Sequence, residues 1–214
     1  MLKTIEIDFN DICNLSLIPV PMSRNPLRGI CELILQKNKN VIKKSLDLLH
    51  PSQCPIDFNN ANIFLPWIHY KSKHRDTFLD VYLNKENKIK KIKKLQNLIT
   101  SMQTIGYKPE LFPTRQGGFI TGYFLQHKNV KRFYIMSGNH RAAVLTALFP
   151  NKKISVALNR FEFLKTKEIQ DSIFKKNQVC PTIFNSKNVS NWPAVSSKYI
   201  TAEKAVNIFK RYFK

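Results

Sequence analysis

The chain has 214 residues, of which 43% are hydrophobic and 11% aromatic, so it can build one buried core with an appended subdomain. No uncharged apolar stretch approaches the ~18 residues that span a bilayer. The N-terminal MLKTIEIDFND carries acids where a signal peptide has a positive start. We therefore expect a soluble, cytoplasmic protein with no membrane partner. The cysteines are scattered without a CxxC pair, which argues against a zinc ribbon or a disulfide framework.

The formal net charge of +21 has two explanations. A polyanionic partner such as nucleic acid would be bound by the many lysines. Alternatively, the abundance of Lys, Asn, Ile and Phe reflects a chain encoded by AT-rich DNA. Charge acts on association and not on fold, so it does not by itself name a partner.

The first predicted elements are a strand, two helices and a loop. TIEIDFN over residues 4–10 alternates apolar and polar residues, which predicts a half-buried strand. Asn25 and Pro26 are suited to the cap and first turn of a helix that ends near Lys37, and a second helix is expected over residues 41–49. Residues 51–70 predict an ordered loop in which FLPWIHY packs on the core.

The clearest helix is predicted over residues 86–105. Its apolar residues form one stripe at helical spacing, namely Ile89, Ile92, Leu95, Leu98, Ile99, Met102 and Ile105. Gly106 stands where a left-handed C-terminal cap is needed. The remaining surface carries lysines that we expect to point to solvent, namely Lys88, Lys90, Lys91 and Lys93.

The rest of the chain predicts a small α/β core and a helical end. A glycine-containing segment at 117–125 precedes strands at 132–137 and 154–158, with a helix at 139–148 between the two strands. Further helices are expected at 166–176 and 201–213.

The junction MSGNHRAAVLTAL, residues 136–148, carries the strongest functional signal. A helix N-terminus has unpaired N–H groups and a partial positive charge, so it attracts anions. Gly138 lets the backbone turn, Asn139 can cap the helix, and His140 and Arg141 add donors for phosphate oxygens. The alternative to an anion-binding role is that Asn139 only caps the helix and that His140 and Arg141 face solvent.

Three sequence pieces in order resemble the ParB/sulfiredoxin superfamily over about residues 88–158. They are IKKLQNLITSMQTIGYKP, YIMSGNHRAAVLTAL and KISVAL. The turn is most similar to the glycine–cysteine–histidine–arginine turn of sulfiredoxins. The resemblance implies an α/β fold with a ParB/sulfiredoxin-like core and a small mixed sheet at 85–160. Residues 1–84 would pack on this core, and 161–214 would form a C-terminal helical extension of one compact unit.

The resemblance also implies nucleotide-binding residues. A lysine and two small hydroxyl residues on the long helix would correspond to Lys94, Asn97 and Ser101, and the junction would add Ser137, Gly138, Asn139, His140 and Arg141. The spacing of the first three places them on one edge of the helix, beside its apolar stripe. Asn139 stands where a sulfiredoxin has its reactive cysteine, and an amide cannot attack a sulfinyl phosphate, so cysteine-sulfinate repair is not expected.

Three functions remain open. The first is an ATP-dependent phosphotransferase acting on a hydroxyl of a small molecule, or a nucleotide hydrolase, using ATP or another nucleotide with Mg²⁺. Asp8, Asp11 and His140 are its candidate catalytic residues, since a carboxylate would orient the hydroxyl. The second is a ParB-like nucleic-acid-binding protein, although no helix-turn-helix follows the fold. A binding or scaffold module without catalysis is a third alternative.

Overall fold

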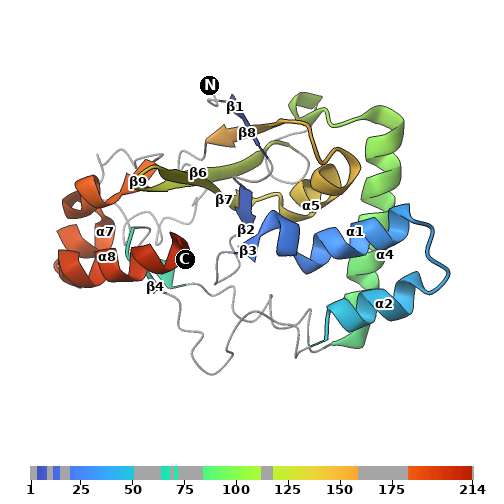
Figure 1. The fold of residues 1–214 in the computed structure, drawn as a ribbon, viewed down its shortest axis with the longest axis horizontal. Coiled ribbons are helices and arrows are strands. Elements are labelled where there is room, and N and C mark those ends of the chain that lie inside the picture. Colours follow the sequence, from blue (N-terminus) through green and yellow to red (C-terminus); the bar gives the residue numbers. More distant parts are fainter. Residues whose placement is uncertain are drawn as a thin grey trace.

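A computed structural model describes residues 4–8, 12–14, 20–50, 64–67, 70–71, 84–111, 118–158 and 183–213. Within these ranges the protein is mixed α/β, and its main sheet has the strand order β1-β8-β6-β7-β2-β3, with β9 also pairing with β6 (Figure 1). The strands are β1 (Thr4–Ile7), β2 (Ile12–Asn14), β3 (Val20–Pro21), β6 (Ile120–His127), β7 (Val130–Ser137), β8 (Ile154–Leu158) and β9 (Ile183–Asn185). Two short strands, β4 (Phe64–Leu65) and β5 (Tyr70–Lys71), pair separately.

The centre of the sheet contains both parallel and antiparallel pairs. β6 and β7 form an antiparallel hairpin, and β6 runs parallel to β8 on its other side. The expected mixed sheet containing strands near 132–137 and 154–158 is therefore present. The α/β class is confirmed, whereas the ParB/sulfiredoxin-like identity of the core stays a prediction.

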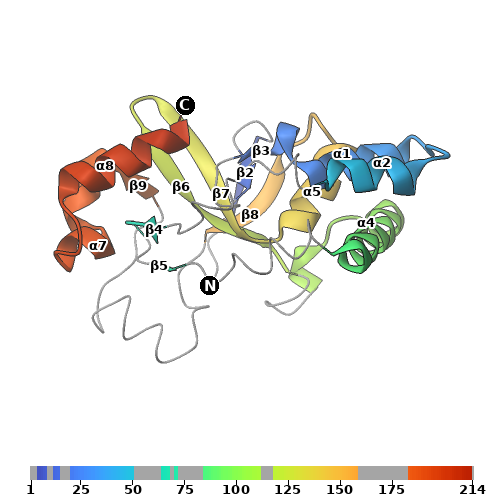
Figure 2. The same cartoon turned by 90° about the horizontal axis from the view of Figure 1, so that it is seen from below.

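Helices cover the two faces of the sheet in two groups (Figures 1 and 2). The first group is α1 (Pro26–Leu35), α2 (Val41–Leu48), α4 (Lys85–Ile105) and α5 (Asn139–Leu148), and the second is α7 (Pro193–Ser196) and α8 (Ala202–Lys210). Short 3-10 helices occupy Met22–Arg24, Pro109–Leu111, Ser186–Asn191 and Arg211–Phe213. None of the helices in the described ranges has the length and apolar composition that crossing a membrane requires.

Successive side chains of the β6–β7 hairpin point to opposite faces of the sheet, so the core is divided between these two groups of helices. Phe133 and Ile135 of β7 pack with apolar residues of α1, α4 and α5, whereas Tyr134 between them packs with the aromatic cluster on the other face. That second cluster contains Trp67, Tyr123, Phe184, Trp192 and Phe209. Trp67 is fully buried, as expected for the segment FLPWIHY.

Local sequence signals explain most helix boundaries. The Asn25 side chain accepts a hydrogen bond from the Leu27 N–H at 2.9 Å and caps α1, with Pro26 in the first turn. Asn84 caps α4 in the same way, and Gly106 ends α4 with φ +78°. The helix expected at 166–176 lies outside the described residues.

Two expectations about the surface of α4 are wrong. Ile105, placed in the buried stripe, is 48% exposed because it lies in the last turn, past the end of the packing against the core. Lys88 and Lys91, expected to point to solvent, are half-buried, whereas Lys90 and Lys93 are exposed. The buried residues of α4 are Ile92, Leu95, Ile99 and Met102.

Candidate anion-binding site at the start of α5

The turn between β7 and α5 depends on glycine at position 138. Gly138 has φ +100° and ψ +20°, a left-handed conformation that L side chains rarely adopt. A Cβ at this position would lie 3.1 Å from the Ile120 Cα and 3.1 Å from an Arg141 side-chain nitrogen. The turn therefore packs closely against the start of β6, and a larger residue would force the two apart.

Asn139 does not cap α5, contrary to the sequence prediction. Gly138 occupies the cap position and no side chain caps the helix there, because the helix already begins at Asn139. The first hydrogen bond of the helix runs from the Ala142 N–H to the Gly138 carbonyl at 2.9 Å. The backbone N–H groups of residues 139–141 lie before this bond, so they have no acceptor within the helix. The Asn139 Oδ1 atom is buried without a hydrogen-bond partner.

The His140 imidazole is half-buried at the same helix start. Its Nε2 atom is buried and has no hydrogen-bond partner. Burial lowers the pKa of His140 to about 3, and the nearby positive charges of Lys91, Lys94 and Arg141 act in the same direction. His140 is therefore neutral at pH 7, surrounded by three cations.

Two of these cations come from α4, which packs against α5. Lys94 is exposed, as expected for a residue beside the apolar stripe, and its charge acts on His140. Lys91, one helical turn earlier, is half-buried, and burial followed by the charge of Lys94 lowers its pKa. Neither lysine forms an ion pair with a described residue.

Lys91 is the residue of this cluster that sequence reasoning missed. Its position in the helix could have indicated its half-burial, because Lys91 directly precedes buried Ile92 and lies four residues before buried Leu95. That spacing puts Lys91 at the edge of the buried face.

Arg141 is bound to the protein itself. Its Nη1 donates a hydrogen bond to the Gly118 carbonyl, which lies just before β6. Beside it, the Tyr107 hydroxyl accepts a hydrogen bond from the Ile120 N–H at 3.0 Å. Burial lowers the pKa of Arg141, and burial raises the pKa of Tyr107. One of the donors expected for phosphate oxygens is therefore used within the protein, to hold the segment just before β6.

The other predicted phosphate-binding residues are exposed. Ser137 ends β7 beside the turn, and Asn97 and Ser101 follow Lys94 along α4. Among the described residues, no hydrogen bond joins Asn97 or Ser101 to the start of α5. Their role in nucleotide binding stays a prediction.

The candidate carboxylates do not join this cluster. Asp8 is exposed and follows β1, which is separated from β7 by β8 and β6. Three strand spacings of about 4.8 Å each put the two strands roughly 14 Å apart. Asp11 lies outside the described residues. In the described part of the chain, no group of three or more His, Cys, Asp or Glu residues could hold a metal ion, so Mg²⁺ would need phosphate oxygens and water as its main ligands there.

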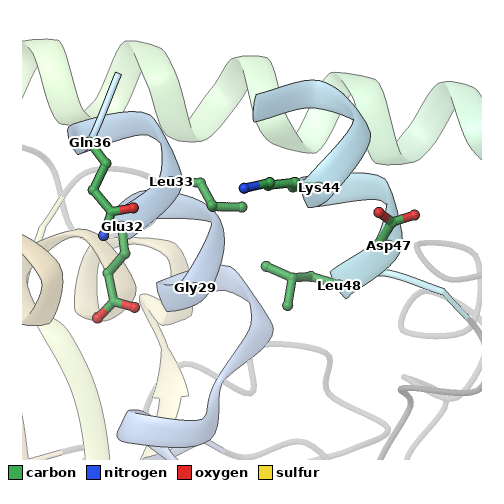
Figure 3. A pocket seen from close by; sticks show the side chains of 7 residues that line it. All are labelled: Gly29, Glu32, Leu33, Gln36, Lys44, Asp47 and Leu48. Atoms are coloured by element: carbon green, nitrogen blue, oxygen red, sulfur yellow. The ribbon is translucent and has the colours of Figure 1, made fainter. Parts of the chain in front are cut away.

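A separate groove of about 510 Å³ lies between α1 and α2. It is lined by Gly29, Glu32, Leu33, Gln36, Lys44, Asp47 and Leu48, and Figure 3 shows Lys44 reaching across it toward α1. None of the predicted nucleotide-binding residues lines this groove.

A scan against protein-family models, a search of curated proteins and a search of solved structures gave no match for this chain. The similarity to the ParB/sulfiredoxin superfamily therefore depends on the three sequence pieces alone.

Proposed function

We propose that this protein binds a nucleotide, with ATP as the first ligand to test, through phosphates at the start of α5. The observation that carries the proposal is that three positive charges act on a half-buried, neutral histidine. Lys91, Lys94 and Arg141 all act on His140, and neither lysine has a described acidic partner.

Positive charges that act together on one half-buried side chain favour an anion beside it. The charge of Lys94 disfavours the charged form of Lys91, all three cations disfavour the charged form of His140, and burial lowers the pKa of both Lys91 and Arg141. A phosphate group would offset this repulsion and accept hydrogen bonds from the first backbone N–H groups of α5. The described side chains therefore fit the phosphate part of a nucleotide.

The reaction we propose is transfer of a phosphoryl group from ATP to a hydroxyl of a small molecule, with hydrolysis of the nucleotide as the simpler alternative. Such transfer depends mainly on positioning and on charge stabilisation, which the cluster would supply. Neutral His140 can accept a hydrogen bond or proton through an unprotonated ring nitrogen. Asp11, which lies outside the described residues, stays the sequence candidate for the carboxylate that orients the hydroxyl, since Asp8 lies apart.

Nucleic-acid binding is the second candidate function. The observation that favours it is the row of exposed lysines on α4, Lys85, Lys90, Lys93 and Lys94, in a chain of net charge +21. Such a surface would bind phosphates without reading bases, because no described element offers an arginine-rich reading head.

Binding of ATP, CTP and duplex DNA, measured side by side from 50 to 300 mM salt, tests the proposal. A nucleotide site predicts saturable binding of one ATP or CTP per chain that persists at the higher salt. Binding of DNA alone, falling steeply with salt, would replace the proposal with the second candidate.

A further inference from the structure

We infer that Lys91 is the principal side chain that binds phosphate at this site, and that Arg141 is a positioning residue. This inference rests on the proposed nucleotide-binding function. It differs from what the sequence resemblance implies, which is phosphate binding by Lys94 and Arg141.

The position of Lys91 sets it apart from the exposed lysines around it. It stands between exposed Lys90 and buried Ile92 on α4, the helix that packs against α5. Long lysine side chains normally extend so that the ammonium group reaches water. Here the side chain is half-buried, its charge reaches His140, and no described acid pairs with it.

Two polar side-chain atoms in the first turn of α5 have no hydrogen-bond partner. The Asn139 Oδ1 and the His140 Nε2 are both buried without a hydrogen-bond partner. Buried polar atoms in native proteins are almost always hydrogen-bonded, so such pairs of exceptions often mark a place where a ligand or water binds. A protonated phosphate oxygen can donate to these atoms, while Lys91 binds an unprotonated one.

Arg141 is bound to the backbone of the protein itself. Its guanidinium lies over the turn, 3.1 Å from where a Gly138 Cβ would be, and donates to the Gly118 carbonyl. Together with the hydroxyl of Tyr107, which holds the Ile120 N–H, it fixes residues 118–120 against the start of α5. Arg141 therefore shapes the turn that presents the helix N–H groups.

The test compares matched variants of the full chain by calorimetric titration with ATP and by thermal unfolding without ligand. Lys91→Met should weaken ATP binding by about tenfold or more, the scale of a lost charge-assisted hydrogen bond. Its melting temperature should stay the same or rise, since a half-buried charge beside Lys94 is removed. The neighbouring, exposed Lys90→Met is the control and should change the affinity by less than about twofold.

Arg141 is tested by rescue and by salt dependence. Arg141→Leu should lower both the melting temperature and the ATP affinity, and Arg141→Lys should restore much of both, because one donor can still reach the Gly118 carbonyl. The decrease of affinity with salt should become shallower in Lys91→Met, which loses a phosphate contact, and stay unchanged in Arg141→Leu.

The outcomes separate this inference from the function on which it rests. Failure of the wild-type chain to bind ATP and inorganic triphosphate at low salt would overturn both. Nucleotide binding by the wild type with equal losses in Lys91→Met and Lys90→Met would overturn the inference alone. A shallower salt dependence in Arg141→Leu would show that Arg141 contacts phosphate and would likewise overturn it.

Discussion

His140 is the residue whose surroundings define the candidate site. Its imidazole is half-buried, its Nε2 atom has no partner, and three cations surround it. A structural histidine of a core is usually hydrogen-bonded, and a histidine that serves as a cation is usually placed beside an acid. Neither description fits His140, which favours a role toward an anionic ligand.

The lowered pKa of His140 predicts a specific loss of stability in mild acid. The ordinary histidine pKa of 6.5 holds in the unfolded chain, whereas the folded value is about 3. Between these values the unfolded chain binds a proton that the folded chain does not, so the free energy of unfolding falls as the pH drops below 6.5 and this loss levels off near pH 3. At about 1.4 kcal/mol per pH unit, His140 would account for roughly 2–3 kcal/mol by pH 4.5.

Urea unfolding of the wild type and of His140→Asn between pH 7 and pH 4.5 measures this loss. The variant should be less sensitive to acid than the wild type, while carboxylates and the other histidines contribute equally to both. If the free energy of unfolding falls with pH by the same amount in the two proteins, His140 takes up its proton in the folded state as easily as in the unfolded one.

At the scale of the element, the β7–α5 turn is held by the conformation of one glycine. Gly138→Ala places a side chain at φ +100° and brings its Cβ to 3.1 Å from the backbone of Ile120. The strained backbone alone costs about 1–3 kcal/mol, and we expect the contact with Ile120 to add to it and to weaken ATP binding. Chemical denaturation of the variant measures the loss of stability, and titration with ATP measures the loss of affinity.

Gly29→Ala in α1 is the matched control for this substitution. Its Cβ would meet only the flexible end of the Leu48 side chain at 3.1 Å, and alanine favours a helix over glycine by up to about 1 kcal/mol. Gly29→Ala should therefore be close to neutral. Equal stability of the two variants would contradict the close packing of the turn against β6.

Elements with strong local signals were predictable from the sequence. α5 and β8 have the predicted bounds, and α4 differs from its prediction by one residue at the start. Helical periodicity and the caps Asn84 and Gly106 carry this information within a few residues of chain. The pairing of β1 with β8, which brings the start of the chain beside residues 154–157, has no such local signal.

The candidate site was predictable only in part, for the same reason. Gly138 and His140 form a recognisable run in the sequence, and the resemblance to the ParB/sulfiredoxin superfamily pointed to Lys94. The half-burial of Lys91 and the bond from Arg141 to the Gly118 carbonyl depend on how α4, α5 and β6 pack together. Chain-distant packing of this kind leaves no pattern in one sequence.

At the scale of the whole molecule, the sheet separates the candidate site from an aromatic core. Phe209 of α8 is fully buried there and makes edge or tilted ring contacts with Trp67, Trp192 and Phe213 at centroid distances of 5.0–5.5 Å. The helices α4 and α5, which carry the candidate site, lie on the opposite face of the sheet (Figure 2). Stability and ligand binding should therefore respond to different substitutions.

Phe209→Ala should lower the free energy of unfolding by about 3–5 kcal/mol, because it opens a cavity in the aromatic core. ATP affinity measured at a temperature where the variant is folded should match the wild type. This is the reverse of the pattern expected for Lys91→Met. If Phe209→Ala leaves the chain unfolded, Phe209→Leu makes the same comparison with a smaller cavity. A loss of ATP affinity in a folded Phe209 variant would mean that the two faces are coupled.

A phosphate-bearing ligand that binds where α4 meets the start of α5 must change the surroundings of the His140 imidazole. The measurement is a proton NMR titration of the five histidine rings with ATP, with the His140 signal assigned from its absence in His140→Asn. We predict a saturable shift of the His140 signal, and a rise of its pKa from about 3 toward the ordinary value as the bound phosphate offsets the charges of Lys91, Lys94 and Arg141. An unchanged His140 signal at ATP concentrations that saturate binding would contradict a phosphate site at the start of α5.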